Sequence, residues 1–207
     1  IAWKNNARRK PLILWGARQV GKTWLMKEFG KKHFDNYVYI SFYNNKQISS
    51  IFEKDYDVKR IINSIEIELH TKIKPNKTLI IFDEIQSETK VLESLKYFCE
   101  EANEYAVIAA GSLLGVALHY GVSFPVGKVD ELRLYPLSFK EFLMGLDEDK
   151  LAQYIEDWNN PEVNDFSEKY SDLLRKYMFI GGMPEVVDRY RLNQDPDEVR
   201  ELQLSIV

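Results

Sequence analysis

The chain has 207 residues, of which 45% are hydrophobic and 29% charged, so it has ample apolar material for the core of a large domain or of a domain and a half. Its formal net charge of −4 gives no overall basic field for nucleic acid or an anionic membrane, although a local basic patch is compatible with this average. The single Cys99 rules out an internal disulfide and a cysteine metal cluster, which favours the reducing cytoplasm. No apolar run approaches the ~20 residues that a membrane-spanning helix needs.

Apolar runs that we interpret as buried strands alternate with amphipathic helices over the first two thirds of the chain. The expected strands are PLILW (11–15), NYVYISFY (36–43), TLIIFDE (78–84), YAVIAAGS (105–112) and DELRLYPL (130–137). The expected helices lie within TWLMKEFGKKH (23–33), FEKDYDVKRIINSIEIELHTKI (52–73), which PNK (75–77) ends, and VLESLKYFCEEANE (91–104). Strands that are apolar on both faces and separated by helices indicate a parallel sheet covered on each side.

From residue 138 onward the pattern is purely helical, with a polar linker near 157–165. We therefore expect residues 1–137 to form the core domain and residues 138–207 a small helical lid. The chain opens on Ile1 and its last stretch, DEVRELQLSIV, stops within a helical pattern, so we expect a piece of a longer protein with a truncated lid.

Residues 16–23, GARQVGKT, match the phosphate-loop (Walker A) pattern, in its required setting of a strand before and a helix after. Glycines let consecutive backbone N–H groups turn toward phosphate oxygens, and the helix N-terminus adds positive potential. We expect Lys22 to bridge the β- and γ-phosphates and the Thr23 hydroxyl to bind Mg²⁺. The expected nucleotide-binding residues here are Gly16, Ala17, Arg18, Gln19, Val20, Gly21, Lys22, Thr23 and Trp24. The alternative is a plain glycine turn between a strand and a helix.

The strand LIIFDE delivers Asp83 and Glu84 at its carboxyl end, the edge where ligands bind in parallel sheets, and supplies a Walker B pair. Asp83 is the expected Mg²⁺ ligand, and Glu84 can accept a proton from an attacking water. The alternative is that the two acids only cap the following helix.

An additional strand separates the loop from LIIFDE in sequence, which favours an order in which AVIAAGS lies between the phosphate-loop strand and the Asp83 strand. Ser112 would then emerge between Thr23 and Asp83, within reach of the γ-phosphate or the attacking water. The alternative for Ser112 is a turn and a helix N-cap.

Six segments, GARQVGKT, TLIIFDEIQ, AAGSLLGVAL, SFPVGKV, LYPLSFKEFL and GGMPEVV, together resemble the bacterial and archaeal AAA-family ATPases of the AAA_14/DUF4143 type, in the signal-transduction branch. The likeness runs from about residue 8 to residue 190 with the motifs in order. It implies a P-loop NTPase three-layer α/β sandwich with a mostly parallel five-stranded sheet in the order 5-1-4-3-2, followed by the lid and by further winged-helix and nuclease-like domains. It also favours ATP as the nucleotide, and GTP stays open as an alternative.

Related signalling ATPases carry a Gly-x-Pro motif whose proline contacts adenine, and Gly182-Met183-Pro184 matches it. The residues alone indicate a glycine turn followed by proline at the first helical position. Both interpretations of Pro184 stay open here.

One position departs from the resemblance: many relatives have Gly-Arg where this chain has Gly127-Lys128. An arginine at this position could stabilise charge on the γ-phosphate of a bound nucleotide, whereas lysine is a point charge without the bidentate fork of arginine. Either Lys128 substitutes, Arg133 serves, no trans-acting finger operates, or Lys128 is a solvated loop residue; Arg18 could equally face solvent or a neighbouring subunit. The three histidines, His33, His70 and His119, lack metal-site spacing, and the basic opening (3–10) fits either nucleic-acid contact or a solvated helix end.

Three functions follow from these expectations. The first is Mg²⁺-dependent ATP hydrolysis in which turnover moves the lid. The second is a nucleotide-gated switch that hydrolyses slowly, and the third is a phosphotransferase with a small acceptor. A homo-oligomer or a protein partner bound through the lid stays open, as does nucleic acid.

Overall fold

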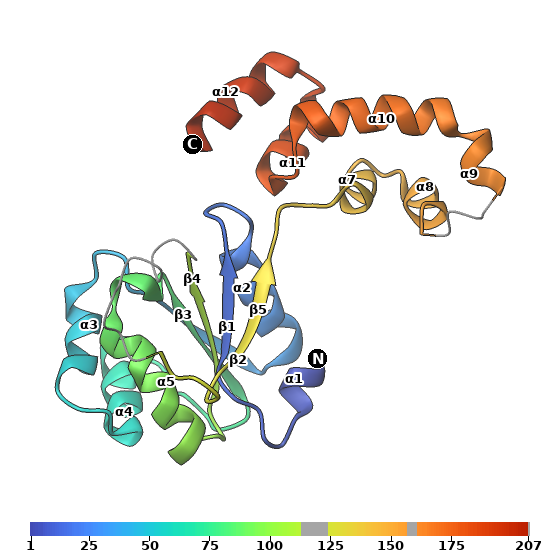
Figure 1. Cartoon of the computed structure of the whole chain (residues 1–207). Coiled ribbons are helices and arrows are strands. Elements are labelled where there is room, and N and C mark those ends of the chain that lie inside the picture. Colours follow the sequence, from blue (N-terminus) through green and yellow to red (C-terminus); the bar gives the residue numbers. More distant parts are fainter. Residues whose placement is uncertain (113–123, 157–160, 207) are drawn as a thin grey trace. The chain divides into compact units, whose positions relative to one another are not determined.

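The computed structural model describes residues 1–112, 124–156 and 161–206, and the chain divides into two compact units (Figure 1). The first unit comprises residues 1–16 and 21–134, and the second comprises residues 17–20 and 135–207. Within the described residues, no helix combines the length and the apolar character that crossing a bilayer requires.

The described part of the first unit is built on a five-stranded sheet in the order β2-β3-β4-β1-β5, in which every neighbouring pair is parallel. The strands are β1 (Leu12–Gly16), β2 (Asn36–Ser41), β3 (Thr78–Asp83), β4 (Ala106–Gly111) and β5 (Asp130–Leu134). This is the predicted order 5-1-4-3-2 counted from the other edge, so the fold class and the strand order are confirmed. Because β4 lies between β1 and β3, the predicted insertion of AVIAAGS is also confirmed.

Helices cover both faces of this sheet, which gives three layers. The helices of this unit are α1 (Ala2–Asn5), α2 (Lys22–His33), α3 (Lys46–Glu53), α4 (Val58–Glu68), the short 3-10 helix η1 (Ile85–Ser87) and α5 (Thr89–Glu101). Alternate residues of each strand point to opposite faces. Ile80 and Phe82 of β3 join the core beneath α3, α4 and α5, whereas Leu79 and Ile81 join the core beneath α2.

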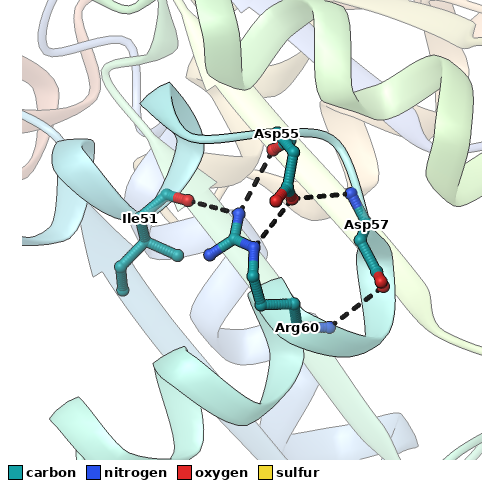
Figure 2. A network of polar contacts seen from close by, with 4 residues as sticks. All are labelled: Ile51, Asp55, Asp57 and Arg60. Atoms are coloured by element: carbon teal, nitrogen blue, oxygen red, sulfur yellow. Dashed lines mark hydrogen bonds and ion pairs between the residues drawn. The ribbon is translucent and has the colours of Figure 1, made fainter.

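The helix predicted within residues 52–73 is α4, whereas α3, which was not predicted, is a separate helix that a break at Lys54–Asp57 divides from α4 (Figure 2). The Asp57 side chain accepts a hydrogen bond from the Arg60 backbone N–H at 3.1 Å, which makes Asp57 the N-cap of α4. The Arg60 guanidinium donates to Asp55 Oδ1 at 2.7 Å and to the Ile51 carbonyl of α3 at 2.7 Å. These bonds fix the turn between the two helices, and the Arg60 hydrogen bond holds the pKa of Asp55 below its usual value.

From Phe139 onward, the described part of the second unit consists mainly of helices. Its helices are α7 (Phe139–Gly145), α8 (Asp149–Tyr154), α9 (Pro161–Asp165), α10 (Ser167–Ile180), α11 (Pro184–Asn193) and α12 (Pro196–Ile206). Ser138 and Glu141 form a capping box at the start of α7. The expected linker at 157–165 is in part a helix, since Pro161–Asp165 forms α9, and residues 157–160 lie outside the described residues.

Arg9 fastens the start of the chain to the two loops that precede β3 and β4. Its side chain is only 9% exposed, and one terminal nitrogen donates to Asn76 Oδ1 at 2.9 Å and to the Glu104 carbonyl at 3.0 Å. Lys4 donates to the His33 carbonyl and lies over the Phe34 ring. Both cations are therefore engaged within the unit, which weakens the interpretation of the basic opening as a nucleic-acid contact.

We expect Arg9→Ala to lower the free energy of unfolding by about 1–3 kcal/mol, because the Asn76, Glu104 and Lys4 oxygens lose a charged donor. Urea denaturation measures the change. The matched control is Arg8→Ala, since Arg8 is exposed and adjacent. Equal effects of the two substitutions would contradict a structural role specific to Arg9.

Candidate functional site

Several predicted site residues come together where β1, β3 and β4 end. All strands run parallel, so their carboxyl ends share one edge of the sheet. Gly16 ends β1, Asp83 ends β3, and Ser112 directly follows β4. Lys22 and Thr23 open α2, the helix that follows β1.

The turn from β1 into α2 adopts the backbone conformation that its glycines allow. Gly21 is the N-cap of α2 with a φ of +96°, a left-handed conformation that a residue with a Cβ adopts only under strain. Gln19 also has a positive φ, of 59°. Gly21 makes no side-chain capping bond to the start of α2, and uncapped N–H groups at the start of a helix can bind an anion. Ala17, Arg18, Gln19 and Trp24 are exposed, whereas Val20 is buried.

Lys22 is a buried cation at this turn, with only 7% of the residue exposed. Its Nζ donates to the Gly16 carbonyl at 2.9 Å, so the side chain folds back along the loop that it follows. A buried ammonium needs anionic or dipolar partners, and a phosphate group supplies them.

Thr23 and Asp83, the two expected Mg²⁺ ligands, are in direct contact. Thr23 Oγ1 donates to Asp83 Oδ2 at 2.6 Å, and Asp83 is only 2% exposed. The Glu84 backbone N–H donates to the other carboxylate oxygen at 3.0 Å. Thr23 and Asp83 are 60 positions apart in the sequence, and the fold brings them into contact.

This donor set fits Mg²⁺. The Thr23 hydroxyl uses its one hydrogen toward Asp83 and keeps its oxygen lone pairs for a cation. Among the described residues, no group of three or more His, Cys, Asp or Glu could hold a metal by itself. Mg²⁺ is usually held by one or two protein oxygens together with phosphates and water, so the Thr23–Asp83 pair suits an ion that is shared with a nucleotide.

Tyr39 is a third partner of Asp83 that the sequence analysis missed. Its hydroxyl donates to Asp83 Oδ2 at 3.0 Å, and Lys27 Nζ lies 3.8 Å from the centre of its ring. Burial, followed by the charge of Asp83, raises the pKa of Tyr39 to about 12, so the hydroxyl stays protonated at neutral pH. The signal in the sequence is the register: Tyr39 pairs with Ile81, which lies on the same face of β3 as Asp83.

We expect Tyr39→Phe to lower the free energy of unfolding by about 1–2 kcal/mol, because a buried carboxylate loses one donor. The matched control is Tyr37→Phe, the same change two residues earlier on the same face of β2. Chemical denaturation of both variants measures the difference, and equal destabilisation would mean that the Tyr39 hydroxyl contributes nothing specific to Asp83.

Glu84 and Ser112 are connected through Gln86, a second residue that the sequence analysis missed. Gln86 Nε2 donates to Glu84 Oε2, and Gln86 Oε1 accepts from the Ser112 backbone N–H at 3.1 Å. The Gln86 carboxamide thus bonds both to Ser112, at the end of β4, and to Glu84, the expected proton acceptor. The residues that follow Ser112 in GSLLG, from 113 to 123, lie outside the described residues.

Lys128 does not lie at the carboxyl ends of the strands. It precedes β5, whose first residue Asp130 pairs with Leu12 at the start of β1, whereas Gly16 pairs with Leu134. Its Nζ forms an ion pair with Glu100 at 2.8 Å, which raises the pKa of Lys128. Lys128 therefore cannot assist the phosphate loop of its own chain. Arg133 is exposed near the carboxyl end of β5, beside Trp15.

Within the second unit, the GGMP segment has a structural explanation. Gly181 has a φ of +77°, and a Cβ at Gly182 would meet the backbone of Leu137. The Leu137 N–H donates to the Gly182 carbonyl at 2.7 Å, and Pro184 is the first residue of α11. This is the glycine turn and proline start that the residues alone indicate.

A glycine-rich turn between β1 and α2, an acidic end of β3 and the strand order β2-β3-β4-β1-β5 define a P-loop NTPase-like α/β fold. The family model AAA_14, described as an AAA domain, matches residues 8–143. The chain belongs to this family of AAA-type ATPase domains.

Among solved structures, a Walker-type ATPase of Pyrococcus abyssi matches with a TM-score of 0.50 and 17% identity, covering 95% of this chain and 67% of that one. A structure of Drosophila ORC bound to DNA matches with a TM-score of 0.46 and 16% identity, covering 97% of this chain and 56% of that one. At these identities the likeness to the Pyrococcus protein concerns the fold alone. The comparison with curated proteins gives no match.

Proposed function

We propose that this chain binds ATP with Mg²⁺ and hydrolyses it, and that nucleotide turnover moves the helical unit as a lid. The observation that carries the proposal is the 2.6 Å contact between Thr23 and Asp83, next to the start of α2. A buried lysine on the same turn supports it, because the two features together supply a phosphate partner and a metal partner.

In this proposal, backbone amides and the Lys22 ammonium group bind the phosphates of ATP. The residues of the turn from Gly16 to Thr23 contact the triphosphate through their backbone N–H groups. Lys22 donates to the β- and γ-phosphates, and Trp24 lies beside the nucleotide. Thr23 and Asp83 would hold Mg²⁺, which when bound neutralises charge on the triphosphate oxygens.

Glu84 has the proposed role of orienting the attacking water and accepting its proton. Ser112 is the proposed polar sensor at the end of β4, in reach of the γ-phosphate or the water. Most of the catalytic effect then comes from positioning and from fixed charges rather than from covalent chemistry.

The proposal extends to the lid and to partners. Pro184, which begins α11, is the proposed adenine contact, and this contact favours ATP over GTP. The proposed compartment is the cytoplasm. A homo-oligomer, or a protein partner bound through the lid, would use the movement, and Lys128 or Arg133 would then be the residues to test as donors toward a neighbouring subunit.

Phosphate release measured with and without Mg²⁺, alongside ATP affinity, tests the proposal. The 207-residue chain and the longest natural chain that contains it are both assayed, because assembly can control turnover. We expect Mg²⁺-dependent release of phosphate. ATP binding without turnover in either form would favour the slow switch instead, and absence of ATP binding would overturn the nucleotide site.

A further inference from the structure

Gln86 occupies an unusual place among the residues of the candidate site. It belongs to η1, directly after β3, and its carboxamide is partly buried. The amide nitrogen donates to the Glu84 carboxylate, and the amide oxygen accepts from the Ser112 backbone at 3.1 Å. Both ends of one planar group are therefore engaged, each by a residue proposed to act on the γ-phosphate or the water.

The backbone is shaped so that these contacts can form. Glu84 has a φ of +60° and a ψ of 40°, a left-handed conformation that is uncommon for a residue with a side chain. This conformation starts the η1 turn, and residues 84 and 86 meet across it.

The position of the Gln86 amide oxygen depends on Gly111, the last residue of β4, because only a residue without a Cβ leaves room for it. A Cβ at this position would lie 3.1 Å from Gln86 Oε1 and 2.9 Å from the Trp15 ring. Glycine therefore provides the room that Gln86 needs to reach the end of β4.

We propose that Gln86 is a positioning residue that fixes the Glu84 carboxylate relative to the end of β4 for water attack. Its amide N–H₂ group holds the Glu84 carboxylate in one orientation, and its amide oxygen ties that orientation to the Ser112 backbone. Misplacing a reacting group by about 1 Å is enough to cost on the order of 100-fold in rate. This inference rests on the proposed ATP hydrolysis and assigns to Gln86 no contact with the nucleotide.

Two variants separate the two ends of the carboxamide. Gln86→Leu has a similar size and removes both bonds, whereas Gln86→Glu keeps an acceptor for Ser112 and replaces the donor with a second carboxylate facing Glu84. The control is Gln47→Leu, since Gln47 is an exposed glutamine on α3 of the same unit.

The first measurement is hydrogen exchange of the Ser112 amide in the protein without nucleotide. We expect exchange to be about tenfold faster in Gln86→Leu, because the amide loses its acceptor, and close to the original rate in Gln86→Glu. Unchanged exchange in Gln86→Leu would overturn the structural half of the inference.

The second measurement is kcat for ATP together with nucleotide affinity. We expect kcat to fall by about 10- to 100-fold in both variants, while ATP affinity changes less than about twofold. A normal kcat in Gln86→Glu, or a loss of affinity as large as the loss of kcat, would overturn the positioning role, since a merely structural residue gives these results.

Failure of this inference is distinguishable from failure of the proposed function. If the unchanged protein and Gln47→Leu hydrolyse ATP and the Gln86 variants do so equally well, only the Gln86 inference is overturned. If the unchanged protein does not hydrolyse ATP in any form tested, the proposed function fails and the inference fails with it.

Discussion

Glu84→Gln is expected to reduce kcat for ATP hydrolysis by about 10²- to 10⁴-fold while ATP affinity stays within about twofold. Glutamine keeps the length of the side chain and can still accept the Gln86 hydrogen bond through its carbonyl oxygen, but it does not take a proton from water. The loss therefore falls on the chemical step. Because Thr23, Asp83 and Lys22 are unchanged, the residues proposed to hold the nucleotide remain in place.

Single-turnover phosphate release and equilibrium binding of a fluorescent ATP analogue measure the two quantities. The matched control is Glu101→Gln, which changes an exposed carboxylate at the end of α5. Turnover by Glu84→Gln at the original rate would remove Glu84 from the mechanism. Parallel losses of rate and affinity would instead indicate that Glu84 shapes the site as a whole.

Lys22→Ala is expected to weaken ATP binding on the order of 100-fold, with turnover lost at any practical ATP concentration. The substitution removes the proposed charged donor for the phosphates at a residue that is only 7% exposed, where water replaces it poorly. It also removes the bond to the Gly16 carbonyl, so the loop loses one internal tie.

Calorimetric titration with ATP measures this change, and circular dichroism checks that the variant keeps its fold. Lys32→Ala is the matched control, since Lys32 is exposed on the same helix, α2. Normal ATP affinity in Lys22→Ala would show that the nucleotide site has been assigned to the wrong residues.

The strands of the sheet could be predicted because they are short, apolar on both faces and separated by helical patterns. Periodicity places all five within a few residues of their observed bounds, and parallel pairing then brings Gly16 and Asp83 to one edge. Helix ends are less predictable. The break between α3 and α4 depends on bonds that Asp57 and Arg60 make, which compete with a continuous helix and leave no mark on the apolar spacing.

Residues of the site that depend on contacts across strands were harder to predict. Asp83 could be predicted from its motif. The hydrogen bond from Tyr39 to Asp83 depends on the register between β2 and β3, which only the folded sheet defines. Gln86 lies within the quoted motif TLIIFDEIQ, yet its importance depends on the left-handed Glu84 and on the space beside Gly111. Lys128 is the opposite case, a residue whose motif suggested a role that the fold does not support. Its motif suggested a phosphate contact, but it precedes β5 and lies where the strands begin, away from their carboxyl ends.

The bond from Tyr39 to Asp83 has a consequence for how the outermost strand is held. Since β2 is an edge strand that pairs only with β3 among the described strands, its alignment has fewer constraints than that of the inner strands. A slip by one residue would turn Tyr39 to the opposite face and bring Val38 or Ile40 toward a buried carboxylate. The misaligned sheet would thus leave Asp83 short of a donor, so the same hydroxyl that serves the site also penalises incorrect pairing during folding.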